Sequence, residues 1–188
     1  MAQFHPTGND LNGNRSYLRF LVHAQLDQRV RQRVDASDVV QETLLEAHRS
    51  LEQFQGESES DLTAWLRRIL ARRLAHAFRD HTRQRRDVRR ERSLEASLDA
   101  SSYRMQQFVA SDSTSPSQNA ASAERLRELA DALEALTSQQ REALILHYFQ
   151  ARTVPQIAKA MQKSEAAIGG LLHRGMQALK AQFRNSAG

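Results

Sequence analysis

Apolar residues in this 188-residue chain recur at intervals of three and four positions, the spacing that places them on one face of an α-helix. No alternating run of Val, Ile or Thr reaches the length of a strand. Seven glycines and three prolines leave few points at which a helix has to break. The sequence therefore predicts an all-α protein.

Composition excludes several classes of protein. The chain has no cysteine, which rules out disulfides and thiolate metal sites. No apolar run approaches the ~20 residues of a membrane span, so no membrane insertion is expected. The N-terminal "MAQFHPTGND" lacks the pattern of a secretory signal, and we expect a cytoplasmic protein. Without a glycine-rich phosphate loop, an HExxH motif or a nucleophile motif, we expect no enzyme, no metal and no other cofactor.

Three blocks follow one another along the chain. Residues 11–92 have strong helical patterning, and residues 123–185 regain it after an interruption. Residues 93–122 lose the pattern after Phe108 and become rich in Ser, Thr, Asp and Asn, a composition typical of a linker. The sequence predicts two small helical domains joined by a flexible linker.

Charge is distributed unevenly within the first block. Residues 35–61 include eight acidic residues and a single arginine. Residues 67–92 include eleven arginines and three acidic residues. Neighbouring segments of opposite sign indicate one basic and one polyanionic partner, unless the two segments neutralise each other within the fold.

Two helices are expected before the arginine-rich segment. The first carries an apolar stripe of Tyr17, Phe20, Leu21, Ala24 and Leu26. The second begins at Asp35 as N-cap, with an apolar stripe of Val40, Leu44, Ala47, Leu51 and Phe54. Its opposite face carries Asp38, Gln41, Glu42 and Glu46, which either bind a partner or only face solvent.

The arginine-rich segment continues as a long helix that Asp61 is expected to cap. Its apolar positions are Leu62, Trp65, Leu66, Ile69, Leu74 and Phe78, and its basic positions are Arg67, Arg68, Arg72, Arg73 and Arg79. Guanidinium groups bind phosphates and aromatic rings stack on unpaired bases, so this helix is a candidate nucleic-acid surface. The spacing of Trp65 favours a core position over base stacking.

The last block predicts a helix-turn-helix. Thr137 and Gln140 form one expected capping box; Thr153 and Gln156 form a second, ahead of a short helix. Ser164 caps the next helix, whose outward face is Glu165, Ala166, Gly169, Gly170, His173, Arg174 and Gln177. The first turns of such a helix enter a DNA major groove, although a plain helical hairpin has the same pattern.

Three segments together resemble one known family. The segments "DASDVVQETLLEAHR", "AWLRRILARRLAHAFRD" and "LEALTSQQREALILHYFQARTVPQIAKAMQKSEAAIGGLLHRGMQALK" resemble bacterial RNA polymerase sigma factors of the sigma-70 family. Within it the chain resembles the extracytoplasmic-function (ECF) type, and "RQRRDVRRERSLEASL" with "SPSQ" is similar to a planctomycete-like subgroup. The resemblance covers roughly residues 15–183.

This resemblance implies a function and partners. Residues 11–92 would be a region 2 domain that docks on the β′ clamp helices of core RNA polymerase through Asp38, Gln41, Glu42 and Glu46. The same domain would melt and recognise the −10 promoter element with Trp65, Arg67, Arg68, Arg72, Arg73 and Arg79. Residues 123–185 would be a region 4 domain that touches the β flap and binds the −35 element with Lys163, Ser164, Glu165, Gly169, Gly170, His173 and Arg174. An anti-sigma protein or another regulator is a further partner that the resemblance allows.

The sequence departs from the family pattern at two places. Gly169 and Leu171 stand where the family often has basic residues, and "ILARRLAH" replaces the common "IARNLAID". We therefore expect Arg174 and Lys163 to contact mainly phosphates, and His173 and Ser164 to lie closest to the bases.

Two other functions would explain parts of the chain. A dimeric helix-turn-helix regulator would account for residues 123–188 but leaves the acidic helix without a role. An arginine-rich RNA-binding protein would account for residues 67–92 but not for the second domain.

Overall fold

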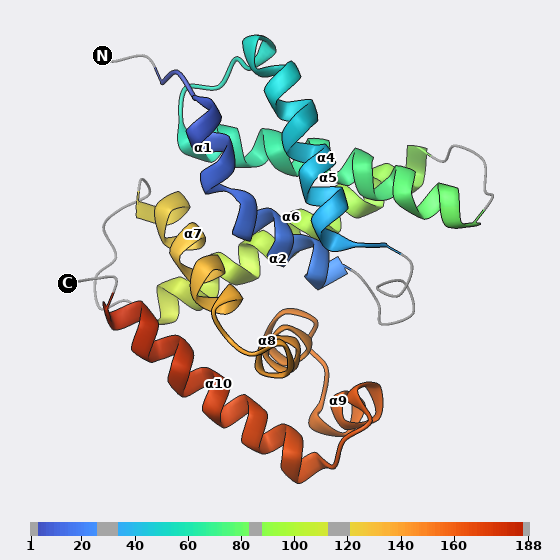
Figure 1. Ribbon diagram of the computed structural model, residues 1–188, viewed down its shortest axis with the longest axis vertical. Helices are drawn as coiled ribbons and strands as arrows, with labels where there is room; N and C mark the ends of the chain where they lie inside the picture. Colours follow the sequence, from blue (N-terminus) through green and yellow to red (C-terminus); the bar gives the residue numbers. More distant parts are fainter. Residues whose placement is uncertain (1–3, 26–33, 83–87, 113–120, 186–188) are drawn as a thin grey trace. The chain divides into compact units, whose positions relative to one another are not determined.

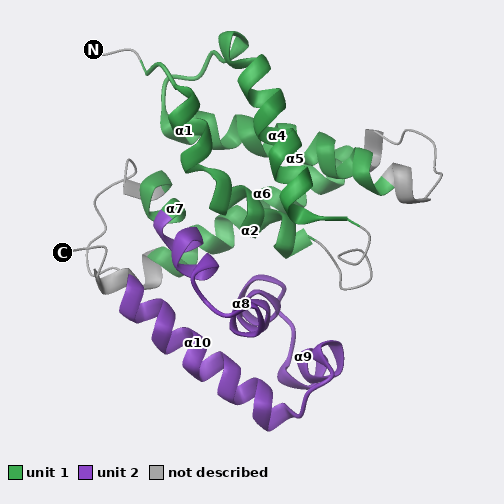
Figure 2. Cartoon of the chain, in the orientation of Figure 1, with its two compact units in different colours: residues 1–127 green, residues 128–188 purple. Residues whose placement is uncertain are grey.

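The computed structural model describes residues 4–25, 34–82, 88–112 and 121–185 (Figure 1). In these ranges all regular elements are helices, and the chain divides into two compact units, residues 1–127 and residues 128–188 (Figure 2). The expected all-α fold with two helical domains is confirmed. No helix in the described ranges combines the length and apolarity that crossing a membrane requires.

Unit 1 is built around four longer helices. They are α2 (Arg15–Gln25), α4 (Ala36–Arg49), α5 (Glu59–Thr82) and α6 (Val88–Asp112), preceded by the short α1 (Gly8–Gly13). A 3-10 turn, Leu51–Gln53, follows α4, and α7 (Ala121–Glu134) begins at the end of this unit. Helix α5 packs against α2, α4 and α6.

The expected apolar stripe of α2 is confirmed where it is described. Tyr17, Phe20, Leu21 and Ala24 are buried, whereas Leu26 lies outside the described residues. Ahead of α2, Thr7 caps α1 in a reciprocal arrangement with Asp10 that sequence reasoning did not identify. Hydrogen bonds from the backbone amide and the hydroxyl of Thr7 lower the pKa of Asp10.

The two helices expected next begin with different caps. The side chain of Asp35 accepts a hydrogen bond from the backbone of Ser37 at 2.7 Å, so the predicted N-cap of α4 is confirmed. Helix α5 begins three residues earlier than expected, at Glu59 instead of Leu62. The Ser58 hydroxyl accepts from the backbone amide of Asp61 at 3.2 Å, and the Asp61 carboxylate accepts from the Ser58 hydroxyl at 2.7 Å. Ser58 is therefore the cap, and Asp61 is its reciprocal partner.

The linker predicted for residues 93–122 is wrong over residues 93–112, which belong to helix α6. Residues 93–112 are helical, and Leu98 and Met105 are completely buried. Their apolar stripe is interrupted by Ser101 and Ser102, which are nevertheless 3% and 2% exposed. Both serines are buried with hydrogen-bond partners, which offsets the cost of removing their hydroxyls from water. The remaining part of the expected linker, residues 113–120, lies outside the described residues.

Unit 2 contains the predicted helix-turn-helix. Helix α8 (Ser138–Leu144) runs into a π-helical turn (Ile145–Phe149) and is followed by α9 (Val154–Met161) and α10 (Glu165–Asn185). Both expected capping boxes, of Thr137 with Gln140 and of Thr153 with Gln156, are present. Gln162 ends α9 in the left-handed conformation, with a φ of 54°, and so turns the chain toward α10.

Side chains from α8, the π-helical turn, α9 and α10 form one apolar cluster in unit 2. It consists of Ala143, Leu146, Ile157, Ala158, Ile168 and Leu171. Gly175 allows α10 to approach α8, because a Cβ at this position would lie only 3.2 Å from the side chain of Leu144. One face of α10 therefore packs against the apolar cluster, and its opposite face is exposed to solvent.

Candidate nucleic-acid interface

The polar face of α4 presents three of the predicted docking residues to solvent. Asp38, Gln41 and Glu42 are exposed. Leu45 lies on the same face and is 49% exposed, so this acidic surface contains an apolar residue that sequence reasoning missed. Its spacing of three from Glu42 and four from Gln41 could have identified it. We call these four residues the docking face; an apolar centre with a polar rim is typical of a protein–protein contact.

Glu46, the fourth predicted docking residue, is engaged within unit 1. Its carboxylate accepts a hydrogen bond from Arg72 Nη2 at 3.1 Å and forms an ion pair with Arg73. Arg73 also lies 3.9 Å from the carboxylate of Glu42. Two arginines from the candidate DNA-binding helix α5 therefore contact an acidic side chain of α4.

Trp65 belongs to a small aromatic cluster at the start of α5. Its ring centroid lies 5.4 Å from that of Phe54, which in turn lies 6.4 Å from Phe4. Trp65 is partly buried, as its apolar spacing indicated.

The loop that leads into α5 has a fixed conformation at Gly56 and Asp61. A Cβ at Gly56 would collide with the ring of Phe54 and with Asp61. Hydrogen bonds from the Ser58 hydroxyl and the Glu57 amide lower the pKa of Asp61. These contacts lie at the start of α5, the helix whose Trp65 and arginines are expected to meet the −10 element.

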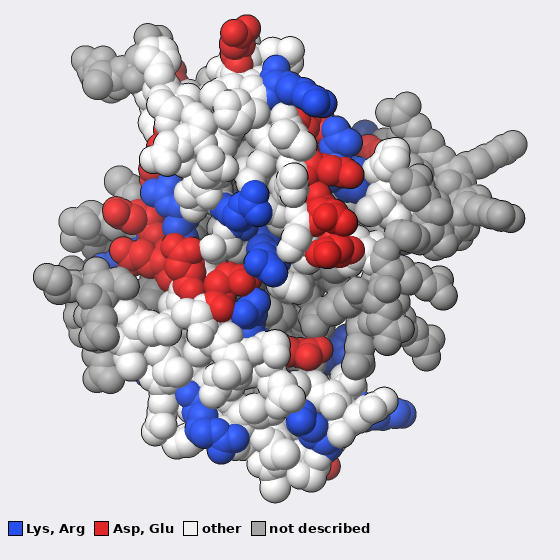
Figure 3. Space-filling view, viewed as in Figure 1, with Lys and Arg blue, Asp and Glu red and all other residues white. Residues whose placement is uncertain are grey.

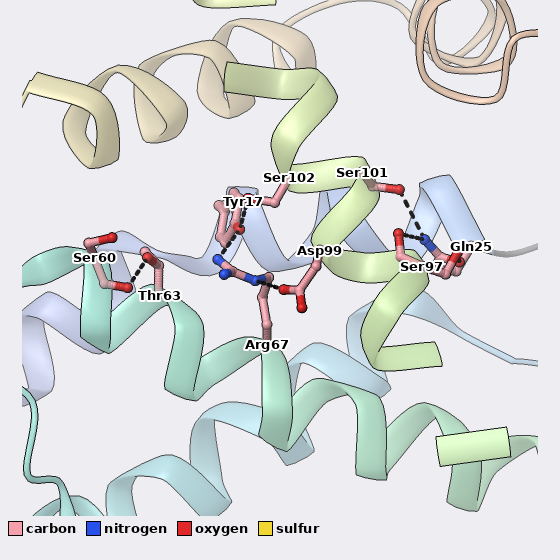
Figure 4. Close-up of polar contacts among 9 residues, drawn as sticks. All are labelled: Tyr17, Gln25, Ser60, Thr63, Arg67, Ser97, Asp99, Ser101 and Ser102. Carbon is pink, nitrogen blue, oxygen red and sulfur yellow. Dashed lines mark hydrogen bonds and ion pairs between the residues drawn. The ribbon is translucent and has the colours of Figure 1, made fainter. Parts of the chain in front are cut away.

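Arg67 lies in a polar network between helices rather than on an open surface (Figure 4). Its Nε donates to Asp99 of α6 at 2.7 Å and its Nη1 donates to the Tyr17 hydroxyl of α2 at 3.0 Å. The Tyr17 hydroxyl donates onward to Ser102 at 2.9 Å. Burial alone lowers the pKa of Arg67, but the interactions with Tyr17 and Asp99 outweigh it and the pKa is raised. The arginine is therefore charged, and it joins three helices.

The remaining arginines predicted to bind DNA differ in accessibility. Arg68 is exposed, and the side chains of Arg72 and Arg73 are 58% and 35% exposed. Arg79 belongs to α5, but its side chain is outside the described part of the structure. The arginines at positions 83, 85 and 86 also lie outside the described residues. On the face shown in Figure 3, acidic side chains gather in patches that adjoin Lys and Arg side chains.

Helix α10 presents the predicted −35 residues on its free face. Ser164, Glu165, Gly169, His173 and Arg174 are exposed, and Lys163 and Gly170 are partly exposed. Ser164 caps the helix, since its hydroxyl accepts from the Ala167 amide at 3.2 Å. Leu171, by contrast, packs into the apolar cluster of unit 2. The face available to DNA therefore includes Gly169 but not Leu171.

Two family matches coincide with these structural features. Residues 15–84, which contain α2, α4 and α5, match Sigma-70 region 2. Residues 126–179, which contain the helix-turn-helix, match Sigma-70, region 4. The chain belongs to the sigma-70 family, and the presence of both regions makes it a sigma factor, which directs transcription initiation.

One relative is similar to this chain over most of its length. The ECF RNA polymerase sigma factor SigX of Bacillus subtilis (strain 168) is 28% identical over 151 residues. The similar segment covers 80% of this chain and 72% of that protein.

Proposed function

We propose that this chain is an ECF-type sigma factor that acts in the cytoplasm by joining core RNA polymerase and selecting its promoters. The observation that carries the proposal is the combination, in one chain, of an exposed acidic docking face on α4 and a helix-turn-helix with an open recognition face. The similarity to SigX supports the ECF type. The tracts "RQRRDVRRERSLEASL" and "SPSQ" support placement in a planctomycete-like subgroup.

We assign polymerase docking and −10 recognition to unit 1. The docking face is acidic and matches a basic partner surface, which we take to be the β′ clamp helices. Arg68 and Arg72 are exposed on α5, and we assign promoter phosphates to them; the aromatic cluster at Trp65 lies near the start of the same helix. Arg67 contributes by holding α2, α5 and α6 together.

Unit 2 supplies −35 recognition in this proposal. The free face of α10 bears His173 and Arg174 beyond a glycine pair, and Ser164 stands at the helix N-terminus. We assign phosphate contacts mainly to Arg174 and Lys163, and base contacts to His173 and Ser164. Contact with the β flap, and control by an anti-sigma protein or another regulator, complete the proposed set of partners.

Run-off transcription tests the proposed function directly. Core RNA polymerase is incubated with a pool of genomic DNA fragments with and without the full chain, and the transcripts are sequenced. We expect transcripts with defined starts, preceded by a shared pair of −35 and −10 sequences, only when the chain is present. If the chain adds no promoter-specific initiation, the proposal is refuted; a stable dimer that binds a palindrome without polymerase would favour a helix-turn-helix regulator instead.

A further inference from the structure

Glu46 occupies a position unlike that of the other acidic residues on α4. Its side chain is 26% exposed, whereas that of Glu42 is 61% exposed. One carboxylate oxygen accepts from Arg72 and the other from Arg73. A carboxylate with both oxygens engaged by arginines inside unit 1 has little capacity left for a partner protein.

The same contacts restrict the two arginines. Phosphate and carboxylate oxygens bind the same guanidinium donors, so a phosphate has to displace Glu46 or share these donors with it. The negative charge of Glu46 also repels a phosphate that approaches Arg72 or Arg73. Ion pairs that are partly exposed contribute only modestly, so Glu46 weakens DNA binding without abolishing it.

We propose that Glu46 is a clasp: in the free protein it holds Arg72 and Arg73 of α5 and thereby limits their binding to DNA phosphates. This inference rests on the proposed function and deepens it. A basic partner surface bound to the docking face competes with Arg72 and Arg73 for the negative charge of α4. This competition weakens the hold of Glu46 on the two arginines, which are then free to bind DNA. Polymerase binding and DNA binding then strengthen each other, as any such coupling must do in both directions.

The clasp assigns different roles to residues that lie on one helix. Asp38, Gln41, Glu42 and Leu45 remain the docking face, although Glu42 also lies 3.9 Å from Arg73, whereas Glu46 regulates α5 through closer contacts with both arginines. Arg73 stands in the segment "ILARRLAH", where the resemblance to the family is interrupted. The Arg73 contact of the clasp is therefore not a feature of that common family pattern.

Neutralising the clasp without changing its shape tests the inference. The full-length Glu46→Gln protein and the wild type are titrated, without polymerase, against a short labelled single-stranded DNA of mixed sequence over a range of salt concentrations. We expect Glu46→Gln to bind about fivefold more tightly at low salt, the effect of releasing an exposed ion pair. The slope of log affinity against log salt should also steepen by about 0.7 for each arginine released.

A matched control separates the clasp from a general change in charge. Glu52→Gln removes the same charge from an exposed residue just beyond α4, for which the described residues provide no ion pair. We expect it to bind DNA like the wild type. The triple variant Glu46→Gln, Arg72→Ala, Arg73→Ala should lose the gain, since the released arginines are gone.

Three outcomes would overturn the inference. They are an unchanged affinity for Glu46→Gln, an equal gain for Glu52→Gln, and a gain that survives removal of both arginines. Circular dichroism confirms that each variant is folded. Run-off transcription with the wild type remains the separate test of the proposed function, so the clasp can fail while the sigma activity stands.

Discussion

Shortening Leu98 to alanine tests whether α6 is a folded part of unit 1 or a flexible connection. The Leu98 side chain is completely buried. Replacing a buried leucine by alanine costs about 2–5 kcal/mol of folding free energy, because apolar contacts are lost and a cavity remains. For a unit of the size of residues 1–127, a loss of about 3 kcal/mol lowers Tm by roughly 10 °C.

The single tryptophan provides a selective measurement of this effect. Trp65 lies in α5, so its fluorescence follows the unfolding of unit 1 whether or not unit 2 unfolds at the same temperature. Tyr103→Ala is the matched control, since Tyr103 lies on the same helix but is 60% exposed. A change at such a surface position stays within about 0.5 kcal/mol. Equal melting temperatures for the two variants would refute the packing of α6 against the core.

Two further predictions concern the docking face and the recognition helix. Gln41→Ala combined with Glu42→Lys should leave the circular dichroism spectrum native and weaken capture of core polymerase about tenfold or more, because a positive charge then faces a basic partner surface; intact capture would contradict the docking role. Gly169→Ala should stabilise unit 2 by about 0.5–1 kcal/mol in urea unfolding, because a Cβ there meets no atom within 4 Å and alanine favours the helix. The same variant should bind −35 duplexes more weakly in gel-shift assays, since the methyl group blocks close approach of DNA, and unchanged binding would remove that role from Gly169.

The helix-turn-helix was predictable because its signals are local. Thr137, Thr153 and Ser164 cap helices whose apolar residues follow at regular intervals, and all three caps are present in the structure. Local hydrogen bonds of this kind depend on residues three positions apart, so the sequence contains all the information they need.

Helix α6 was not predictable in the same way because its burial depends on distant residues. Ser101 and Ser102 interrupt the apolar stripe, and serine is otherwise typical of linkers. Their partners are Gln25 and Tyr17 of α2, which lie 76 and 85 positions earlier in the chain. The engagement of Arg67 by Asp99 and of Glu46 by Arg72 arises in the same way, so the charges of residues 35–61 and 67–92 predicted potential partners without revealing which of them pair internally.

The departures from the family pattern on α10 have unequal consequences for DNA recognition. Leu171 is a core residue of unit 2, so the absence of a basic side chain there removes nothing from the free face. Gly170 has no side chain, and the side chain of Arg174 lies over it. The guanidinium atoms of Arg174 are 3.1–3.5 Å from the position that a Cβ at Gly170 would occupy. Side chains on a helix lean toward its N-terminus, which is the end that enters a major groove. Arg174 therefore covers part of the surface that a side chain at position 170 would otherwise supply.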